Sequence, residues 1–193
     1  GAGKFLPGVI LYRQRDHAGV AYPSRRHPEA TVATSGCGPT ALSMVLAGLL
    51  GLDVSPAETA AFALEHGARA ETGTDMRRLA AQAALRWPLT VTETCDTAEL
   101  IAALQSGAMA ICNTSGDRPG RKGVFSSGGH YVAAAGGDEQ CLLVLDPGIY
   151  PGKYKASHRA GAVTVFGDAL LCSPQTLAQD CAARSPRYYI FQR

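Results

Sequence analysis

The hydrophobic pattern changes along the chain, and this change constrains the fold more than any other feature. In the first half, apolar residues recur every three to four positions, as in Leu42, Val45, Leu46 and Leu49, which is the spacing of a helix. In the second half they gather in short runs rich in β-branched and aromatic residues, which is typical of strands. Helices followed by strands, without strict alternation, predict an α+β fold rather than a doubly wound one.

Capping residues and helix breakers set the limits of the predicted helices. These helices start at Cys37, Ser55-Pro56-Ala57-Glu58, Thr74-Asp75, Asp96-Thr97-Ala98-Glu99 and Ser173-Pro174, and the last four end at His66-Gly67, Trp87-Pro88, Gly107 and Ala183. We expect Ser35 to cap the helix at Cys37, and Pro39 to lie in its first turn, where proline is tolerated.

The strands are expected mainly after these helices. The predicted strands are Leu89–Glu93, Ala108–Asn113, His130–Ala135, Cys141–Asp146 and Arg187–Gln192. Residues 1–36 are predicted to form an irregular arm in which only Val9–Tyr12 resembles a strand. The expected architecture is an N-terminal helical half packed on a C-terminal antiparallel sheet.

The size and composition of the chain indicate one globular domain over residues 1–193. Hydrophobic residues make up 46% of the 193 residues and charged residues 18%, which suits a single core. The opening Gly1-Ala2-Gly3 resembles a cloning remnant, so an earlier signal peptide or lipid anchor stays open. Localisation stays open between a secreted or cell-envelope location and the cytoplasm.

The charge and apolar runs argue against two classes of partner. The formal net charge is +2 and no basic cluster is interleaved with aromatics, so no nucleic-acid partner is expected. The longest apolar stretch, Ala41–Leu52, is interrupted and far shorter than the roughly 20 residues of a transmembrane helix. The Gly116–Gly129 segment is predicted to be a mobile solvated loop that leads into His130 and borders any groove there.

The cysteines and histidines give no sign of a metal or other cofactor. The six cysteines are Cys37, Cys95, Cys112, Cys141, Cys172 and Cys181. They contain no CxxC pair, which argues against a structural zinc site and a thioredoxin-like redox pair, and most of those other than Cys37 are expected to be buried. His17, His27, His66 and His158 have no partner at metal-ligand spacing.

Cys37 is the candidate nucleophile. A thiol in the first turn of a helix meets the partial positive charge of unpaired amide groups, which favours the thiolate. Gly36 and Gly38 flank it and leave the sulfur uncrowded, with the Cys37 amide free to donate to an oxyanion. The alternative is an inert buried cysteine between packing glycines.

His130 and Asp146 are the candidate base and orienting acid. If the strands that contain them form a hairpin with an odd loop centred on Asp138, Ala135 pairs with Cys141 and His130 lies opposite Asp146, with Cβ atoms roughly 5 Å apart. A carboxylate at that position would accept a hydrogen bond from the imidazole and fix its tautomer. A two-residue turn would break this pairing. Together with Cys37, these residues supply the nucleophile, base and orienter of thiol acyl transfer.

These motifs also resemble a known family. The stretch Ser35-Gly36-Cys37-Gly38-Pro39-Thr40-Ala41-Leu42-Ser43-Met44-Val45-Leu46 is similar to the nucleophile motif of the papain-like bacterial cysteine peptidases related to the bacteriocin-processing (double-glycine leader) peptidases, the family 39-like cysteine peptidases. The sequences Tyr12-Arg13-Gln14-Arg15-Asp16, Gly73-Thr74, Gly129-His130-Tyr131-Val132 and Asp146-Pro147-Gly148 resemble further motifs of that family, in the same order. The resemblance implies a papain-like fold and a cysteine peptidase.

The resemblance also implies a role for Gln14 as a side-chain donor to the oxyanion, beside the backbone amide of Cys37. Such a donor contributes roughly 3 kcal/mol to transition-state stabilisation without adding a charge. Gln14 lies 23 positions before Cys37, further than in the processing peptidases themselves. From the residues alone, Gln14 reads as an ordinary surface glutamine.

Three functions stay open. The first is a peptidase or amide hydrolase that acts on a peptide or protein substrate through Cys37, His130 and Asp146. The second is an acyltransferase with the same triad, as in phytochelatin-synthase-like relatives of the papain superfamily. The third is a module that binds a peptide without cleaving it, although such a module would be expected to have lost one of the three residues.

Overall fold

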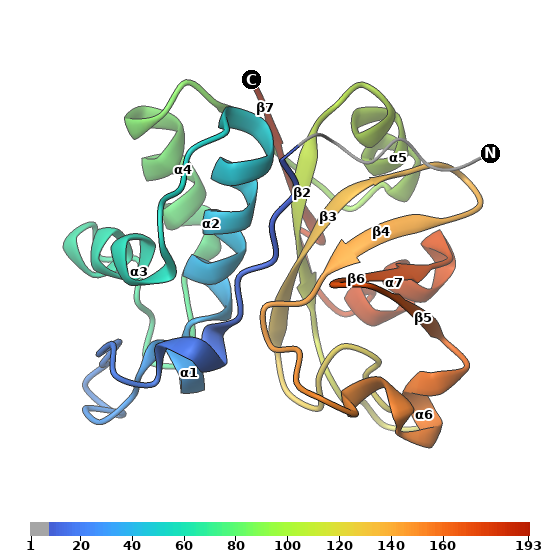
Figure 1. The fold of residues 1–193 in the computed structure, drawn as a ribbon, viewed down its shortest axis with the longest axis horizontal. Helices are drawn as coiled ribbons and strands as arrows, with labels where there is room; N and C mark the ends of the chain where they lie inside the picture. The colour runs from blue at the N-terminus through green and yellow to red at the C-terminus, as the bar shows by residue number, and fades with distance from the viewer. Residues whose placement is uncertain (1–7) are drawn as a thin grey trace.

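Seven strands form one antiparallel sheet in the order β1-β7-β2-β3-β4-β6-β5 (Figure 1). The computed structural model describes residues 8–193. Its strands are β1 (Thr90–Thr94), β2 (Met109–Thr114), β3 (His130–Gly137), β4 (Leu142–Leu145), β5 (Val163–Phe166), β6 (Ala169–Cys172) and β7 (Tyr188–Gln192). The α-helices are α1 (Val32–Ser35), α2 (Cys37–Leu50), α3 (Pro56–Glu65), α4 (Met76–Arg86), α5 (Thr97–Gln105), α6 (Ser157–Ala160) and α7 (Pro174–Cys181), with short 3₁₀ turns η1 (Gln14–His17) and η2 (Lys153–Lys155). The predicted α+β class is confirmed.

The helices begin where their capping residues predict. Ser55 and Glu58 form a capping box at α3, and the Asp75 and Asp96 side chains accept hydrogen bonds from the first turns of α4 and α5. The predicted cap of α2 is wrong: Ser35 ends α1, and Gly36 is the N-cap without a side-chain hydrogen bond. Because α1 leads directly into α2, no capping side chain stands between Cys37 and the cleft described below.

Helices cover both faces of the sheet. Helices α2, α3 and α4 share one buried cluster with alternate strand residues such as Ile111 and Leu145. Helices α5 and α7 share the other with the intervening residues, such as Cys112 and Val144 (Figure 1). The expected packing of an N-terminal helical half on the sheet is therefore seen for α2–α4, whereas α5 covers the opposite face together with α7.

Two predictions of strands differ from the structure. Val9–Tyr12 is not a strand, and the arm instead carries η1 and α1. The hairpin of β5 and β6 was not predicted, although its signal is present: Phe166 pairs with Ala169 across the two-residue turn Gly167-Asp168, where Gly167 adopts φ 60°. Glycine tolerates this left-handed conformation at the first position of such a turn.

The predicted register of β3 and β4 is wrong by two residues, but His130 and Asp146 still share a face. Gly137 pairs with Leu142 across a loop of even length, which alone would put them on opposite faces. The register then shifts between Ala134 and Gly136, where one extra β3 residue forms a bulge. The bulge brings the two side chains back to the same face of the sheet, where His130 and Asp146 are diagonal rather than directly opposed neighbours.

Candidate active site

Cys37 is the first residue of α2 and is half-buried at the wall of a cleft. The amides of a first helical turn have no partner within the helix, so they present partial positive charge to the thiol. The neighbouring glycines serve close packing. A Cβ on Gly38 would lie 2.8 Å from Thr74 Cβ, and one on Gly36 would lie 2.7 Å from Val32 Cα. The Gly73-Thr74 motif therefore packs against the start of α2.

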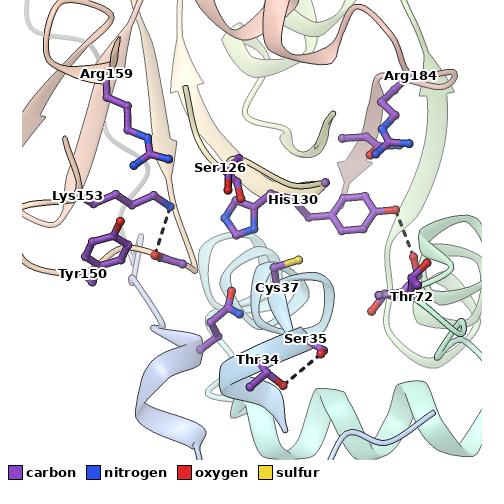
Figure 2. A pocket seen from close by; sticks show the side chains of 18 residues that line it. Thr34, Ser35, Cys37, Thr72, Ser126, His130, Tyr150, Lys153, Arg159 and Arg184 are labelled. Atoms are coloured by element: carbon purple, nitrogen blue, oxygen red, sulfur yellow. Dashed lines mark hydrogen bonds between the residues drawn. The ribbon is translucent and has the colours of Figure 1, made fainter. Parts of the chain in front are cut away.

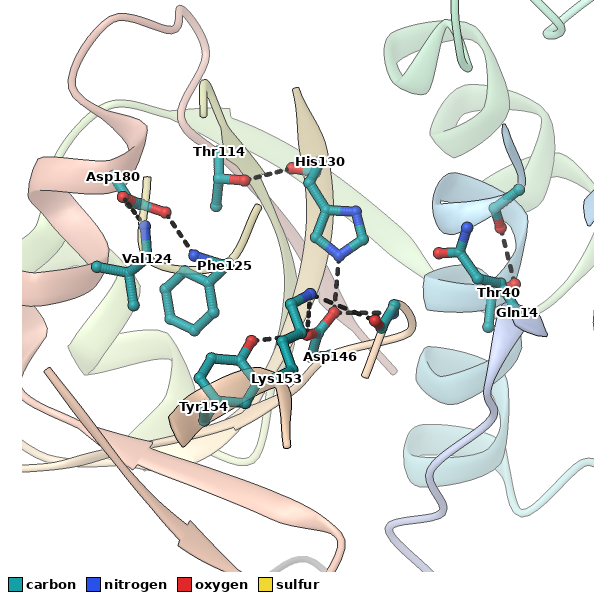
Figure 3. A network of polar contacts seen from close by, with 12 residues as sticks. Gln14, Thr40, Thr114, Val124, Phe125, His130, Asp146, Lys153, Tyr154 and Asp180 are labelled. Atoms are coloured by element: carbon teal, nitrogen blue, oxygen red, sulfur yellow. Dashed lines mark hydrogen bonds and ion pairs between the residues drawn. The ribbon is translucent and has the colours of Figure 1, made fainter. Parts of the chain in front are cut away.

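His130 begins β3 and lies beside Cys37 in the cleft (Figure 2). Its Nε2 atom is 2.7 Å from Asp146 Oδ1, and its carbonyl accepts a hydrogen bond of 2.8 Å from Thr114 Oγ1 (Figure 3). The remaining ring nitrogen, Nδ1, is the one left to interact with the thiol. The structure thus brings the three predicted residues, Cys37, His130 and Asp146, together.

Asp146 is completely buried, and every face of its carboxylate is engaged. Besides His130, Oδ1 accepts a hydrogen bond of 2.8 Å from the Gly148 amide. Oδ2 accepts one of 2.7 Å from Lys153 Nζ and one of 2.6 Å from the Tyr154 hydroxyl (Figure 3). A buried carboxylate with four donors is fixed in position, so it holds the imidazole in one orientation.

Sequence reasoning missed Lys153 and Tyr154. Lys153 is only 5% exposed and forms a buried ion pair with Asp146. A single lysine in a short turn gives no sequence signal of burial, because lysine is usually exposed. Lys153 reaches the carboxylate only because η2 folds back against the loop that follows Asp146.

Electrostatics favour a thiolate and an imidazolium. Burial alone would raise the pKa of Cys37, but the hydrogen bond and positive charge of His130, with the Tyr131 amide, lower it below its usual value. Burial opposes the charge on His130 as well, yet the charge and hydrogen bond of Asp146 raise the pKa of His130 to about 9. Burial of Asp146 is likewise outweighed by His130 and Lys153, which hold its pKa well below the usual range. The proton thus favours the imidazole over the thiol.

Gln14 reaches the cleft, but its amide is already engaged. The Gln14 backbone N–H donates to the Pro147 carbonyl at 2.9 Å, which ties η1 to the loop after Asp146. The side-chain Nε2 donates to the Ala33 carbonyl at 3.0 Å, with a longer contact of 3.4 Å to the Val32 carbonyl. Its Oε1 is buried without a hydrogen-bond partner among residues 8–193. The interpretation of Gln14 as an ordinary surface residue is therefore wrong.

The cleft has a volume of about 650 Å³ and is rich in hydroxyl groups. Thr34, Ser35, Thr72, Thr74, Ser126 and Ser127 all line it. Ser126 and Ser127 belong to the Gly116–Gly129 segment, so the prediction that this segment borders a groove is confirmed. It is not a loosely solvated loop, because the buried Asp180 accepts hydrogen bonds from the Val124 and Phe125 amides (Figure 3).

The other candidate residues lie elsewhere. None of His17, His27, His66 and His158 lines the cleft. Within residues 8–193, no group of three metal-binding side chains is found, and no helix is long and apolar enough to cross a membrane. All six cysteines are free, and Cys112, Cys172 and Cys181 are buried, so most of the five other than Cys37 are buried, as predicted.

No protein-family model matches the chain, and no curated protein sequence matches it either. The chemistry of the cleft must therefore be inferred from its own geometry. A thiol at a helix start, an imidazole beside it and a carboxylate behind the imidazole are the groups that nucleophilic acyl transfer uses.

Proposed function

We propose that this protein is a papain-like cysteine hydrolase that cleaves amide bonds in a peptide substrate. The observation that carries the proposal is the chain of contacts from the Cys37 thiol to the His130 imidazole and on to Asp146 Oδ1, 2.7 Å from His130 Nε2. The placement of the motifs supports it, since each of the five contributes at least one residue to the lining of one cleft. The α+β architecture, with the thiol on a helix and the histidine on the sheet, is compatible with a papain-like fold.

In the proposed reaction, the Cys37 thiolate attacks the carbonyl carbon and forms a tetrahedral oxyanion. The His130 imidazolium then donates its proton to the departing amine as the C–N bond breaks, which leaves a thioester on Cys37. His130, now neutral, removes a proton from water, and the hydroxide oxygen attacks the thioester carbonyl. The products are a carboxylic acid and the restored thiolate–imidazolium pair, while Asp146 keeps the ring oriented throughout.

The oxyanion has two candidate donors in this proposal. One is the Cys37 backbone amide at the start of α2, and the other is Gln14 Nε2. Because a primary amide carries two N–H groups and Ala33 takes one, the second is the group assigned to the oxyanion. The long contact to Val32, at 3.4 Å, is weak enough for a substrate oxygen to replace it.

Digestion of a peptide library, with products identified by mass spectrometry, tests the proposal. We expect cleavage by the unaltered protein, a loss of at least about 10⁴-fold in Cys37→Ala, and full activity in the matched Cys95→Ala variant, which removes an exposed thiol instead. Cleavage that survives Cys37→Ala would rule out the proposal. Added amines that capture most of the acyl group would indicate an acyltransferase instead.

The pH dependence separates the roles of the two residues. Hydrolysis needs the imidazolium proton, so its rate is expected to fall above the His130 pKa of about 9. Alkylation of Cys37 by iodoacetamide needs only the thiolate, so its rate is expected to stay high there. Both rates should fall on the acidic side, where the thiolate takes up a proton. If hydrolysis and alkylation showed the same alkaline limb, His130 would not be the acid.

A further inference from the structure

The charges that line the cleft do not balance. The cationic residues of the lining are His130, Lys153, Arg159 and Arg184, and no aspartate or glutamate from residues 8–193 lines it. The charges of His130 and Lys153 are balanced by Asp146, which contacts both behind the cleft wall, and by the Cys37 thiolate beside His130. Arg159 and Arg184 make no ion pair with any residue from 8 to 193. Two positive charges therefore face the cleft without a counterion in the described part of the chain.

Arg159 is buried, which sets it apart from an ordinary surface arginine. It is only 8% exposed, and its Nε donates to the Val124 carbonyl at 2.9 Å. Its terminal nitrogens make no hydrogen bond with residues 8–193 and are directed toward the cleft (Figure 2). The nearby Asp180 is already occupied by Arg121, at 2.5 Å, and by two backbone amides. Burying a guanidinium without a carboxylate is unfavourable unless a ligand supplies the negative charge.

Arg184 stands at the opposite end of the cleft. It is exposed, and it lies over Gly129, where a Cβ would come within 2.8 Å of Arg184 Nη2. Its side chain makes no hydrogen bond with another described residue. Cys37 and His130 lie between Arg159 and Arg184 (Figure 2). A substrate that passes the thiol would therefore meet a guanidinium on each side.

We propose that the cleft selects acidic substrates, in which a carboxylate binds the free edge of Arg159 on one side of the reacting carbonyl and a second acidic group is attracted by Arg184 on the other. This inference rests on the proposed hydrolase function, since it names the substrate class of that site. A guanidinium binds a carboxylate through two parallel N–H groups, which gives specificity for its position. Arg159 is then a specificity-determining residue, and Arg184 strengthens the attraction from the rim.

A pair of small alkylating agents tests the charge of the cleft without any substrate. Iodoacetate and iodoacetamide carry the same leaving group but differ by one negative charge. We expect the rate ratio of iodoacetate to iodoacetamide at Cys37 to exceed the same ratio for a small free thiol by at least about threefold at low ionic strength. As salt is added, the ratio at Cys37 should approach that of the free thiol. The tryptic peptide from His27 to Arg69 contains no other cysteine, so mass spectrometry reports on Cys37 alone.

Variants assign the effect to the two arginines. Arg159→Gln removes the charge while keeping a donor for the Val124 carbonyl, and it should lower the ratio about twofold or more, whereas Arg159→Lys should keep most of it. Arg184→Gln, at an exposed position, should also lower the ratio and provides the test if Arg159→Gln fails to fold. Arg86→Gln removes an exposed arginine that does not line the cleft and should leave the ratio unchanged.

Peptide pairs then test the substrate class directly. Cleaved peptides that carry glutamate should lose about tenfold in kcat/KM when it is replaced by glutamine, and that difference should shrink in Arg159→Gln. Comparing peptides with a free C-terminal carboxylate and with a C-terminal amide shows whether the cleft binds a side-chain carboxylate or the terminal one. Equal rates for all pairs, or an iodoacetate ratio equal to that of a free thiol, would overturn the inference. If Cys37 reacts no faster with iodoacetamide than a free thiol does, the proposed hydrolase function itself fails.

Discussion

At the scale of single residues, Gly148 shows how closely the site is packed. Its amide donates to Asp146 Oδ1 at 2.8 Å. A Cβ at this position would lie 2.8 Å from His130 Cε1 and 3.0 Å from Nε2. Its backbone is not left-handed, so the requirement for glycine is one of space and not of conformation. Gly148, the last residue of the Asp-Pro-Gly sequence, thus packs directly against the His130 ring.

We predict that Gly148→Ala lowers kcat/KM about 10- to 100-fold, because the added methyl group must displace the imidazole from its position between Cys37 and Asp146. The matched control is Gly161→Ala, where the methyl group meets nothing within 4 Å and the backbone φ is negative. Steady-state kinetics and thermal melts of both variants provide the measurement. Equal activity in Gly148→Ala and Gly161→Ala would mean that the ring has room to adjust.

At the scale of elements, α7 fixes the loop that leads into His130. The Asp180 carboxylate, completely buried, accepts hydrogen bonds from Arg121, Val124 and Phe125. The Asp180 carbonyl also accepts the Ser115 amide at the start of the same loop. With the Ser115 hydroxyl, which donates to the same carbonyl, five hydrogen bonds to one residue hold the cleft wall that carries Ser126 and Ser127.

We predict that Asp180→Ala lowers the free energy of unfolding by about 3 kcal/mol, because it leaves the Val124 and Phe125 amides buried without acceptors and Arg121 without its partner. Hydrogen exchange should accelerate at those two loop amides more than at the amides of the sheet. Asp168→Ala is the matched control, since it breaks an ion pair of an aspartate that is 71% exposed and should cost less than about 1 kcal/mol. Unchanged exchange in Asp180→Ala would show that the loop is held by other contacts.

The elements that the sequence predicted are those with local signals. The capping box at Ser55 and the proline and glycine breakers act within a few residues, so α2, α3, α4, α5 and α7 were predicted nearly to their ends, whereas the one-turn helices α1 and α6 were not predicted. The β3–β4 register was missed because a bulge depends on contacts across the sheet. Cys37, His130 and Asp146 could be predicted as candidate site residues because each lies beside a recognisable turn or helix start. Lys153 was missed, because only tertiary packing makes it buried.

At the scale of the whole molecule, the cleft joins two parts of the structure. Cys37 comes from the helical layer, whereas His130 begins β3 and Asp146 directly follows β4 of the sheet (Figure 1). The thiolate–imidazolium pair is therefore an attraction between the two parts as well as a candidate catalytic device. Its contribution to stability depends on how many protons the folded and unfolded states bind.

The proton count predicts an unusual pH dependence of unfolding. In the unfolded chain, above the ordinary histidine pKa of 6.5 and below the thiol pKa of 9.0, the pair holds one proton, on sulfur. In the folded protein, between the lowered pKa of Cys37 and the His130 pKa of about 9, it also holds one proton, on the imidazole. Because the counts are equal, this pair gives no slope of stability against pH in that window.

We predict that Cys37→Ala introduces a slope there. His130 remains paired with Asp146, so its folded pKa stays raised, and the folded state of the variant holds one proton more than the unfolded state. A raised folded pKa gives stability that is complete below pH 6.5 and is lost as the pH rises toward the folded value, at up to about 1.4 kcal/mol per pH unit. Denaturant unfolding under reducing conditions, at half-unit steps from pH 6.5 to 9, provides the curve of stability against pH for the variant and for the unaltered protein, and their difference cancels all other titrating groups.

The control variant Cys95→Ala should follow the unaltered protein. Parallel curves for Cys37→Ala and the unaltered protein would mean that Cys37 keeps its proton in the fold, and that the two parts meet across a neutral thiol.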